Sequence, residues 1–132
     1  MGIDYGEKRI GISISDPLKI IASDYSVIKN ETLDQVIEEI HKIIEDQKIE
    51  RIIIGLPINM NNSEGFQSKI VREFALNLKK FEKKIIFVDE RESSKKAEQV
   101  MKELKIDKKK IRYTSDAKAA SVILQDYLDY SI

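Results

Sequence analysis

The clearest hydrophobic pattern lies near the start of the chain. From residue 10 to residue 15, isoleucine alternates with glycine or serine. Alternation with a period of two is typical of a half-buried strand. The preceding residues 3–5 are apolar except for one acid, Asp4, and Gly6–Arg9 separates the two stretches as a turn. The pattern therefore predicts a β-hairpin whose first strand carries a single carboxylate.

The same criteria predict the rest of the chain. Thr32 and Gln35 fit a helix-capping box, and a stripe of valine and isoleucine follows at helical spacing. Residues 51–56 (RIIIGL) are almost continuously apolar, as in a strand covered on both faces. The elements expected after the hairpin are a strand at Ile20–Ile28, a helix opened by Thr32, a strand at Arg51–Leu56, a helix at about Ser63–Phe81, a strand at Ile85–Val88, a helix capped by Ser93 or Ser94, a charged connector at Lys105–Arg112 and a last helix capped by Ser115.

The order of these elements predicts the fold class. Three strands in a meander, two helix-strand crossovers and two final helices give the order βββαβαβ followed by helices. We expect an α/β protein of the ribonuclease H-like type, with a five-stranded mixed sheet in the order 3-2-1-4-5 and helices on its faces. At 132 residues the chain is expected to be one domain, 1–132.

Composition narrows the function classes. The chain has no cysteine, which excludes a disulfide framework and a thiolate nucleophile or metal ligand. No apolar run approaches the roughly 20 residues that span a bilayer, and Met1 leads directly into a strand rather than a signal peptide. We therefore expect a cytoplasmic protein with no membrane partner.

Charge is balanced overall but unevenly distributed. Residues 1–68 contain 7 Lys/Arg and 12 Asp/Glu, a net charge of −5, whereas residues 69–132 contain 16 and 11, a net charge of +5. A polarised surface can hold a polyanion beside an acidic site. Solvated, lysine-rich helix faces explain the same pattern, so charge alone does not decide between these interpretations.

Acids occur where the expected strands end and the last helix begins. Asp4 lies in the first strand, Asp89 and Glu90 follow the last strand, and Asp116 opens the last helix. In the expected topology they converge on one edge of the sheet. Converging carboxylates favour Mg²⁺ or Mn²⁺, and two such ions together catalyse phosphodiester hydrolysis. Asp116 also has a structural explanation, because an acid in the first turn stabilises a helix.

Four sequence motifs sharpen this interpretation: GIDYGEKRIGISISD, GLPINMNNSEG, VDERESS and SDAKAASVILQDYL. Together and in this order they resemble the YqgF/RuvX-like family, whose members are named pre-16S rRNA nucleases and Holliday junction resolvase-like proteins. The resemblance covers essentially the whole chain. It implies a ribonuclease H-like fold, a nuclease dependent on divalent metal (Mg²⁺ or Mn²⁺, two ions), and a role in ribosome biogenesis at the 5′ end of pre-16S rRNA. It also implies that Asp4, Glu90 and Asp116 are the catalytic, metal-binding acids.

The second acid is either Glu90 or Asp89. Side chains alternate across a strand, so these two residues point to opposite faces of the sheet, and Glu90 is preferred because it would share the face of Asp4. Lys8, Arg9 and Arg91 are candidates for contacting substrate phosphate. An ion pair with a neighbouring acid explains Arg91 equally well.

The sequence also leaves other functions open. A junction-resolving DNA endonuclease would use the same acids, and it would need two active sites and hence a homodimer, whereas an RNA nuclease can be a monomer. A non-catalytic module that binds nucleic acid or a transcription partner is a second class. The segment Asp4–Gly6 followed by Gly11 also resembles the first phosphate loop of sugar-kinase and actin-like ATPases. Those proteins need two such domains, and this chain has room for one.

Overall fold

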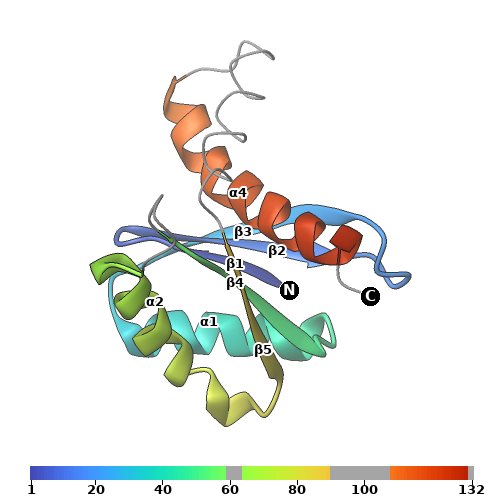
Figure 1. Cartoon of the computed structure of the whole chain (residues 1–132), viewed down its shortest axis with the longest axis horizontal. Coiled ribbons are helices and arrows are strands. Elements are labelled where there is room, and N and C mark those ends of the chain that lie inside the picture. The colour runs from blue at the N-terminus through green and yellow to red at the C-terminus, as the bar shows by residue number, and fades with distance from the viewer. Residues whose placement is uncertain (59–63, 90–107, 131–132) are drawn as a thin grey trace.

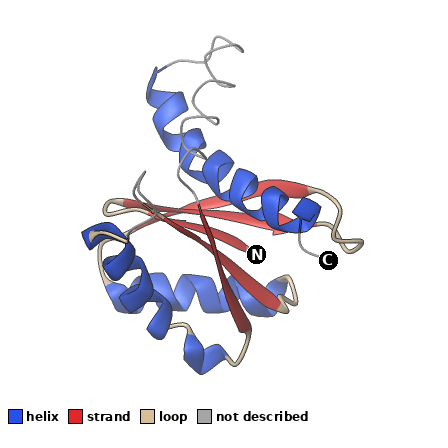
Figure 2. Cartoon of the chain, viewed as in Figure 1, coloured by secondary structure: helices blue, strands red, loops and turns tan. Residues whose placement is uncertain are grey.

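A five-stranded mixed sheet forms the middle layer of the molecule, with helices on both faces (Figures 1 and 2). This computed structural model describes residues 1–58, 64–89 and 117–130, and the backbone of 108–116. The described elements are β1 (Gly2–Tyr5), β2 (Arg9–Ser15), β3 (Ala22–Lys29), α1 (Leu33–Asp46), β4 (Arg51–Leu56), α2 (Phe66–Leu76), a 3₁₀ turn η1 (Lys79–Phe81), β5 (Lys84–Asp89) and α4 (Lys108–Tyr130).

The strand order is β3-β2-β1-β4-β5, which confirms the predicted topology. β1 is antiparallel to β2 and parallel to β4, so the shortest strand is also the central one. Because β1, β4 and β5 run in the same direction, their carboxyl ends meet at one edge of the sheet. Asp4 lies near that edge.

One face of the sheet packs against α1 and α2 (Figure 1). Thr32 caps α1 as predicted, because its hydroxyl accepts a hydrogen bond from the backbone N–H of Gln35. The apolar stripe of α1 is also confirmed: its buried residues are Val36, Ile37, Ile40, Ile43 and Ile44. These side chains form one core with the isoleucines of β1, β2 and β4 that face the same way.

The opposite face is covered by α4, which crosses β3, β2 and β1 (Figure 1). Its contact with the sheet is built from Ile123 and Leu124 packed on Ile53, together with small residues of the helix. Within the described ranges, no helix has the length and hydropathy needed to cross a bilayer.

The predicted bounds of three elements, β3, α2 and α4, are wrong. β3 begins at Ala22, because Ile20 and Ile21 lie exposed in the preceding turn. α2 begins at Phe66, after Gly65, rather than at about Ser63. It ends at Leu76 rather than continuing to Phe81, since the Asn77 amide donates to the backbone carbonyls of Glu73 and Phe74.

The third correction concerns the last helix. α4 begins at Lys108, so most of the expected connector Lys105–Arg112 is helical and Ser115 lies inside the helix rather than at its cap. The helix expected after Ser93 or Ser94 lies outside the described residues.

Candidate active site at the carboxyl end of the central strand

Asp4 lies on the face of the sheet that α4 covers. Ile3 is fully buried in the core on the α1 side. Because side chains alternate along a strand, Gly2 and Asp4 share the other face. Gly2 confirms this assignment: a Cβ built on it would lie 2.8 Å from the carbonyl oxygen of Ala120 in α4. Asp4 is half-buried, two residues further toward the carboxyl end.

Glycine flanks Asp4 on both neighbouring strands. Gly11 of β2 is its register partner in the antiparallel pair. On the other side Ile3 pairs with Ile54 of β4, so the next residue of β4, Gly55, lies beside Asp4. Neither neighbour places a side chain next to the carboxylate. Both glycine positions are themselves buried.

β5 brings a second acid to the same edge but on the opposite face. Val88 pairs with Gly55 and packs in the α4-side cluster, whereas Asp89 pairs with Leu56. Alternation therefore puts Asp89 on the α1 side of the sheet, away from the face of Asp4. Glu90 and Arg91 lie outside the described residues.

α4 is positioned by a close approach to β1 and β2. Ser13 is fully buried, and its hydroxyl donates a 2.7 Å hydrogen bond to the carbonyl oxygen of Ala120. A Cβ on Gly2 would lie 2.4 Å from the Ser13 Oγ and 2.8 Å from the Leu124 Cβ. The helix can reach this depth only because residue 2 has no side chain.

Polar contacts fix the direction in which α4 crosses the sheet. Asp24 of β3 accepts a hydrogen bond from Ser121 and pairs with Lys118 at 3.2 Å. Further along, Gln125 accepts from the backbone N–H of Ala22 and donates to the carbonyl of Ile20, both at 2.8 Å. These contacts lie in the middle and second half of the helix, so they set the path of its earlier turns.

Asp116 lies on those earlier turns. It is one helical turn before Ala120, and eight residues after the start of α4 at Lys108. The expectation that Asp116 sits in the first turn is wrong, so the helix dipole no longer gives a structural reason for an acid there. Only the backbone of Asp116 is described.

The basic candidates of the hairpin lie at this edge too. Lys8 is exposed in the turn between β1 and β2, and Arg9 is the half-buried first residue of β2. Arg9 pairs in register with Lys29 at the end of β3. These positions bring positive charge beside the carboxyl end of β1.

Of the three acids predicted to bind metal at this edge, only Asp4 has a described side chain. Among the residues that the structure describes, no group of three or more histidines and acids is arranged to hold an ion. Two of the three predicted acids lie outside that part of the chain, because Glu90 and the side chain of Asp116 are not described. The donor chemistry fits a hard cation: Asp4 supplies carboxylate oxygens at a half-buried position.

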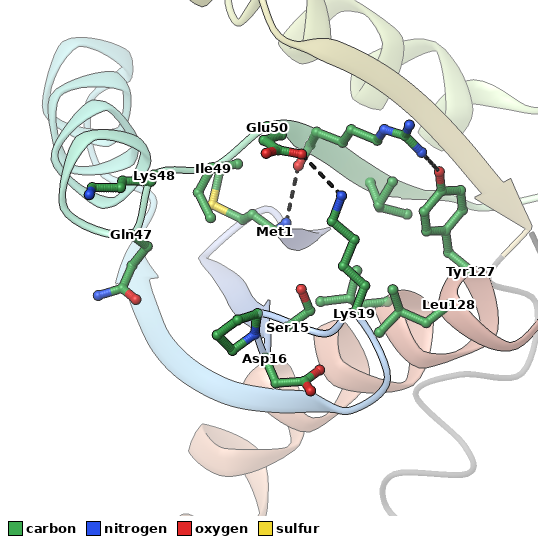
Figure 3. Close-up of a pocket in the computed structure, with 14 residues that line it drawn as sticks. Met1, Ser15, Asp16, Lys19, Gln47, Lys48, Ile49, Glu50, Tyr127 and Leu128 are labelled. Carbon is green, nitrogen blue, oxygen red and sulfur yellow. Dashed lines mark hydrogen bonds and ion pairs between the residues drawn. The ribbon is translucent and has the colours of Figure 1, made fainter.

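The opposite end of the sheet contains a cavity of about 440 Å³ (Figure 3). Its polar groups already bind one another: Lys19 pairs with Glu50 at 3.1 Å, and the Arg51 guanidinium donates to the Tyr127 hydroxyl at 2.8 Å. Asp16 also lines it, and its carboxylate accepts from the backbone N–H groups of Ile21 and Ile20, which lower its pKa. The cavity lies at the amino ends of β1 and β4, so it is separate from the Asp4 edge.

A bidentate ion pair links Glu64, just before α2, to Arg72 in the middle of that helix. Arg72 grips Glu64 with two hydrogen bonds of 2.6 and 2.9 Å and lies 4.8 Å above the ring centre of Phe87. The Arg72 hydrogen bond lowers the pKa of the Glu64 carboxyl. Glu64 also forms a β-bridge with Ile58. These contacts join Glu64 to α2 and to Ile58, which follows the end of β4.

Known proteins are similar in sequence to this chain over nearly its whole length. Residues 1–130 match the family model described as "RuvX: Holliday junction resolvase". The chain belongs to this family. A protein of Natranaerobius thermophilus, named "Putative pre-16S rRNA nuclease", is 40% identical over 100% of this chain and 94% of its own length.

Further relatives carry the same name. The Roseiflexus sp. protein is 38% identical over 98% of this chain and 92% of its own, and the Sulfurihydrogenibium sp. protein is 40% identical over 98% and 88%. The resemblance predicted from the four motifs is thus confirmed, and the five-stranded mixed sheet agrees with the expected ribonuclease H-like fold.

Sequence reasoning missed residues that shape this candidate site. Gly2, Ser13 and Gly55 have no chemistry that marks them as functional, and Ser13 meets Ala120 across 107 residues of sequence. The signal for Gly2 and Ser13 was the small size of alternate residues in the first two strands, and nothing in the sequence marked Gly55. Small residues on one face of a strand indicate close approach by another element.

Proposed function

We propose that this chain is a divalent-metal-dependent nuclease that hydrolyses phosphodiester bonds and processes the 5′ end of pre-16S rRNA. The observation that carries the proposal is the setting of Asp4: a half-buried carboxylate at the carboxyl end of the central strand, between two glycine positions. Membership in the RuvX family and the names of its relatives support the activity and the substrate. Cytoplasmic location follows from that role.

We assign Asp4, Glu90 and Asp116 as the acids that hold the metal. Two Mg²⁺ or Mn²⁺ ions would activate a water molecule and stabilise the leaving oxygen. The fold supports the assignment through the parallel β1, β4 and β5, and through the deep seating of α4 on Gly2. Asp89 is the weaker candidate, because its position in β5 is on the α1 side of the sheet.

The basic residues near this edge are proposed to bind the nucleic-acid substrate. Lys8, Arg9 and Arg91 are proposed to contact phosphates of the substrate, since guanidinium groups bind phosphate oxygens in pairs. For these roles a monomer is sufficient.

The family description favours a second candidate, cleavage of a four-way DNA junction. Its acids would be the same, but symmetric cleavage of two strands requires a homodimer. Measuring the oligomeric state in solution separates this candidate from the first: a strict monomer contradicts junction resolution.

The test compares two substrates under identical conditions. A labelled pre-16S rRNA 5′ leader and a labelled four-way DNA junction are incubated with Mg²⁺, Mn²⁺ or chelator, using wild type, Asp4→Asn and Asp46→Asn. Asp46 is an exposed acid at the end of α1 and provides the matched control.

We expect metal-dependent cleavage of the RNA that Asp4→Asn abolishes and Asp46→Asn leaves unchanged. Cleavage of the DNA junction alone would favour the resolvase. Tight RNA binding without cleavage, unaffected by Asp4→Asn, would instead identify a non-catalytic nucleic-acid-binding module.

A further inference from the structure

We propose that Arg9 and Lys29 form a second phosphate-binding site, which holds the backbone of the substrate strand next to the phosphate that is cleaved at Asp4. This inference rests on the proposed nuclease function and adds Lys29 and Asn30 to it. The site lies where the end of β3 meets the start of β2.

The sheet register places these two cations on the same face as Asp4. Asp4 is opposite Gly11, and Arg9 is two residues from Gly11 along β2, so Arg9 points to the same side. Arg9 is in turn opposite Lys29. From strand spacing and rise, their backbones lie about 8 and about 12 Å from that of Asp4. Both side chains are long enough to reach a phosphate adjacent to one bound at Asp4.

Arg9 and Lys29 are directly opposed across neighbouring strands, so the register brings two positive charges to one place. Lys29 is exposed, and among the described residues it makes no ion pair. A phosphate between the two side chains would make a charge-assisted contact with each of them. The site therefore suits an anionic ligand.

Hydrogen bonds hold this part of the surface in place. Asn30 donates from its backbone N–H to the carbonyl of Lys8, and from its side-chain amide to the carbonyl of Gly6, both at 2.9 Å. The end of β3 is therefore tied to the hairpin turn, and the backbone positions that carry the two cations are fixed relative to the carboxyl end of β1. A prearranged site loses less entropy on binding.

The cations line a shallow hollow of about 450 Å³. Its lining residues are Glu7, Lys8, Arg9, Lys29, Asn30 and Glu31. The two glutamates are exposed or at the rim, so water and salt screen their repulsion of a phosphate, whereas Arg9 is half-buried. The hollow is open on the solvent side, as the path of a continuous strand requires.

The experiment measures how salt affects binding of a single RNA strand. A fluorescein-labelled RNA of about 12 nucleotides is titrated with protein in chelator at several KCl concentrations, and anisotropy gives Kd. The variants are Lys29→Gln and Arg9→Gln, with Lys42→Gln on the outer surface of α1 as the control of equal charge change.

Removing one phosphate contact should reduce the slope of log K against log salt by about 0.7, because a single strand releases that many counterions for each phosphate that the protein neutralises. We expect this change for Lys29→Gln and for Arg9→Gln, and no change for Lys42→Gln. Thermal melting of each variant serves as a second readout, since a merely structural role would lower stability and leave the salt slope unaltered.

A slope for Lys29→Gln equal to that of Lys42→Gln overturns the inference, as does failure of the wild-type protein to bind the RNA. The experiment distinguishes failure of the second phosphate site from failure of the proposed nuclease function. RNA cleavage that persists with an unchanged slope removes the second phosphate site alone. Binding with the expected slopes, but without cleavage under any metal, removes the nuclease and leaves the phosphate site.

Discussion

Replacing Gly2 by alanine tests whether α4 is seated as deeply on the sheet as the site requires. An alanine Cβ would lie 2.4 Å from the Ser13 Oγ, 2.8 Å from the Ala120 carbonyl oxygen and 2.8 Å from the Leu124 Cβ. In an unobstructed strand the same change would stabilise the protein by roughly 0.5–1 kcal/mol, because glycine loses more chain entropy on folding. Here steric overlap reverses the sign.

The magnitude follows from two contributions. Overpacking in a tight core costs about 1–3 kcal/mol. Displacing α4 also weakens the buried hydrogen bond from Ser13 to Ala120, which contributes about 1 kcal/mol. We therefore expect the free energy of unfolding of Gly2→Ala to fall by about 3 kcal/mol. For a domain of this size that lowers Tm by about 10 °C.

The assay is chemical and thermal denaturation of Gly2→Ala, Ser13→Ala and the double variant. Removing the Ser13 hydroxyl relieves only one of the three overlaps, and the backbone oxygen of Ala120 cannot move away without the helix. The double variant should therefore be no more stable than Gly2→Ala. A Gly2→Ala protein as stable as wild type, or full recovery in the double variant, would refute this description of the helix seating.

Two further predictions concern single contacts. Thr32→Ala removes the side-chain acceptor for the N–H of Gln35 and should lower the free energy of unfolding by about 1 kcal/mol in urea denaturation, whereas Thr32→Ser should retain most of it. The pKa of Asp16 is lowered by the N–H groups of Ile21 and Ile20, so its contribution to stability is present above the ordinary aspartate range and lost as pH falls through the folded-state value. Asp16→Asn should therefore lower Tm at neutral pH, and its Tm should converge with that of wild type in acid; a constant difference across the acid range would contradict this.

The sequence was sufficient to predict an element of the fold wherever its local pattern allowed only one kind of element. The strand Arg51–Leu56 was predicted with both boundaries, because a continuous apolar run between a charged residue and a Gly-Leu-Pro turn has few alternatives. The buried stripe of α1 and the strand order followed in the same way. Local pattern and connection length carried this information.

The failures have a different physical origin. The start of α4 was missed because Lys108–Lys110 shows no apolar periodicity, although lysine is a good helix former. Ile20 and Ile21 were assigned to a strand, but the Asp16 carboxylate binds their N–H groups and holds them in a turn.

The site was predictable to a similar, partial extent. A lone acid in a buried strand identified Asp4, and the topology gave its position. The flanking glycine positions and the Ser13–Ala120 contact depend on pairings between distant segments, which no local pattern reveals. The assignments of Glu90, Asp116 and Arg91 remain predictions.

The central claim is that Asp4 binds the metal on which RNA cleavage depends. Its most direct test is the single-turnover rate of cleavage of the pre-16S rRNA 5′ leader, measured over a series of Mg²⁺ concentrations for wild type, Asp4→Asn and Asp46→Asn. Loss of a residue that only supports a metal ligand costs up to about a hundredfold in activity. Asp4 is proposed to bind the metal directly, so we predict that the cleavage rate of Asp4→Asn falls by more than about a hundredfold. Asp46→Asn should cleave at the wild-type rate. An Asp4→Asn protein that folds normally and cleaves at the wild-type rate would contradict the account.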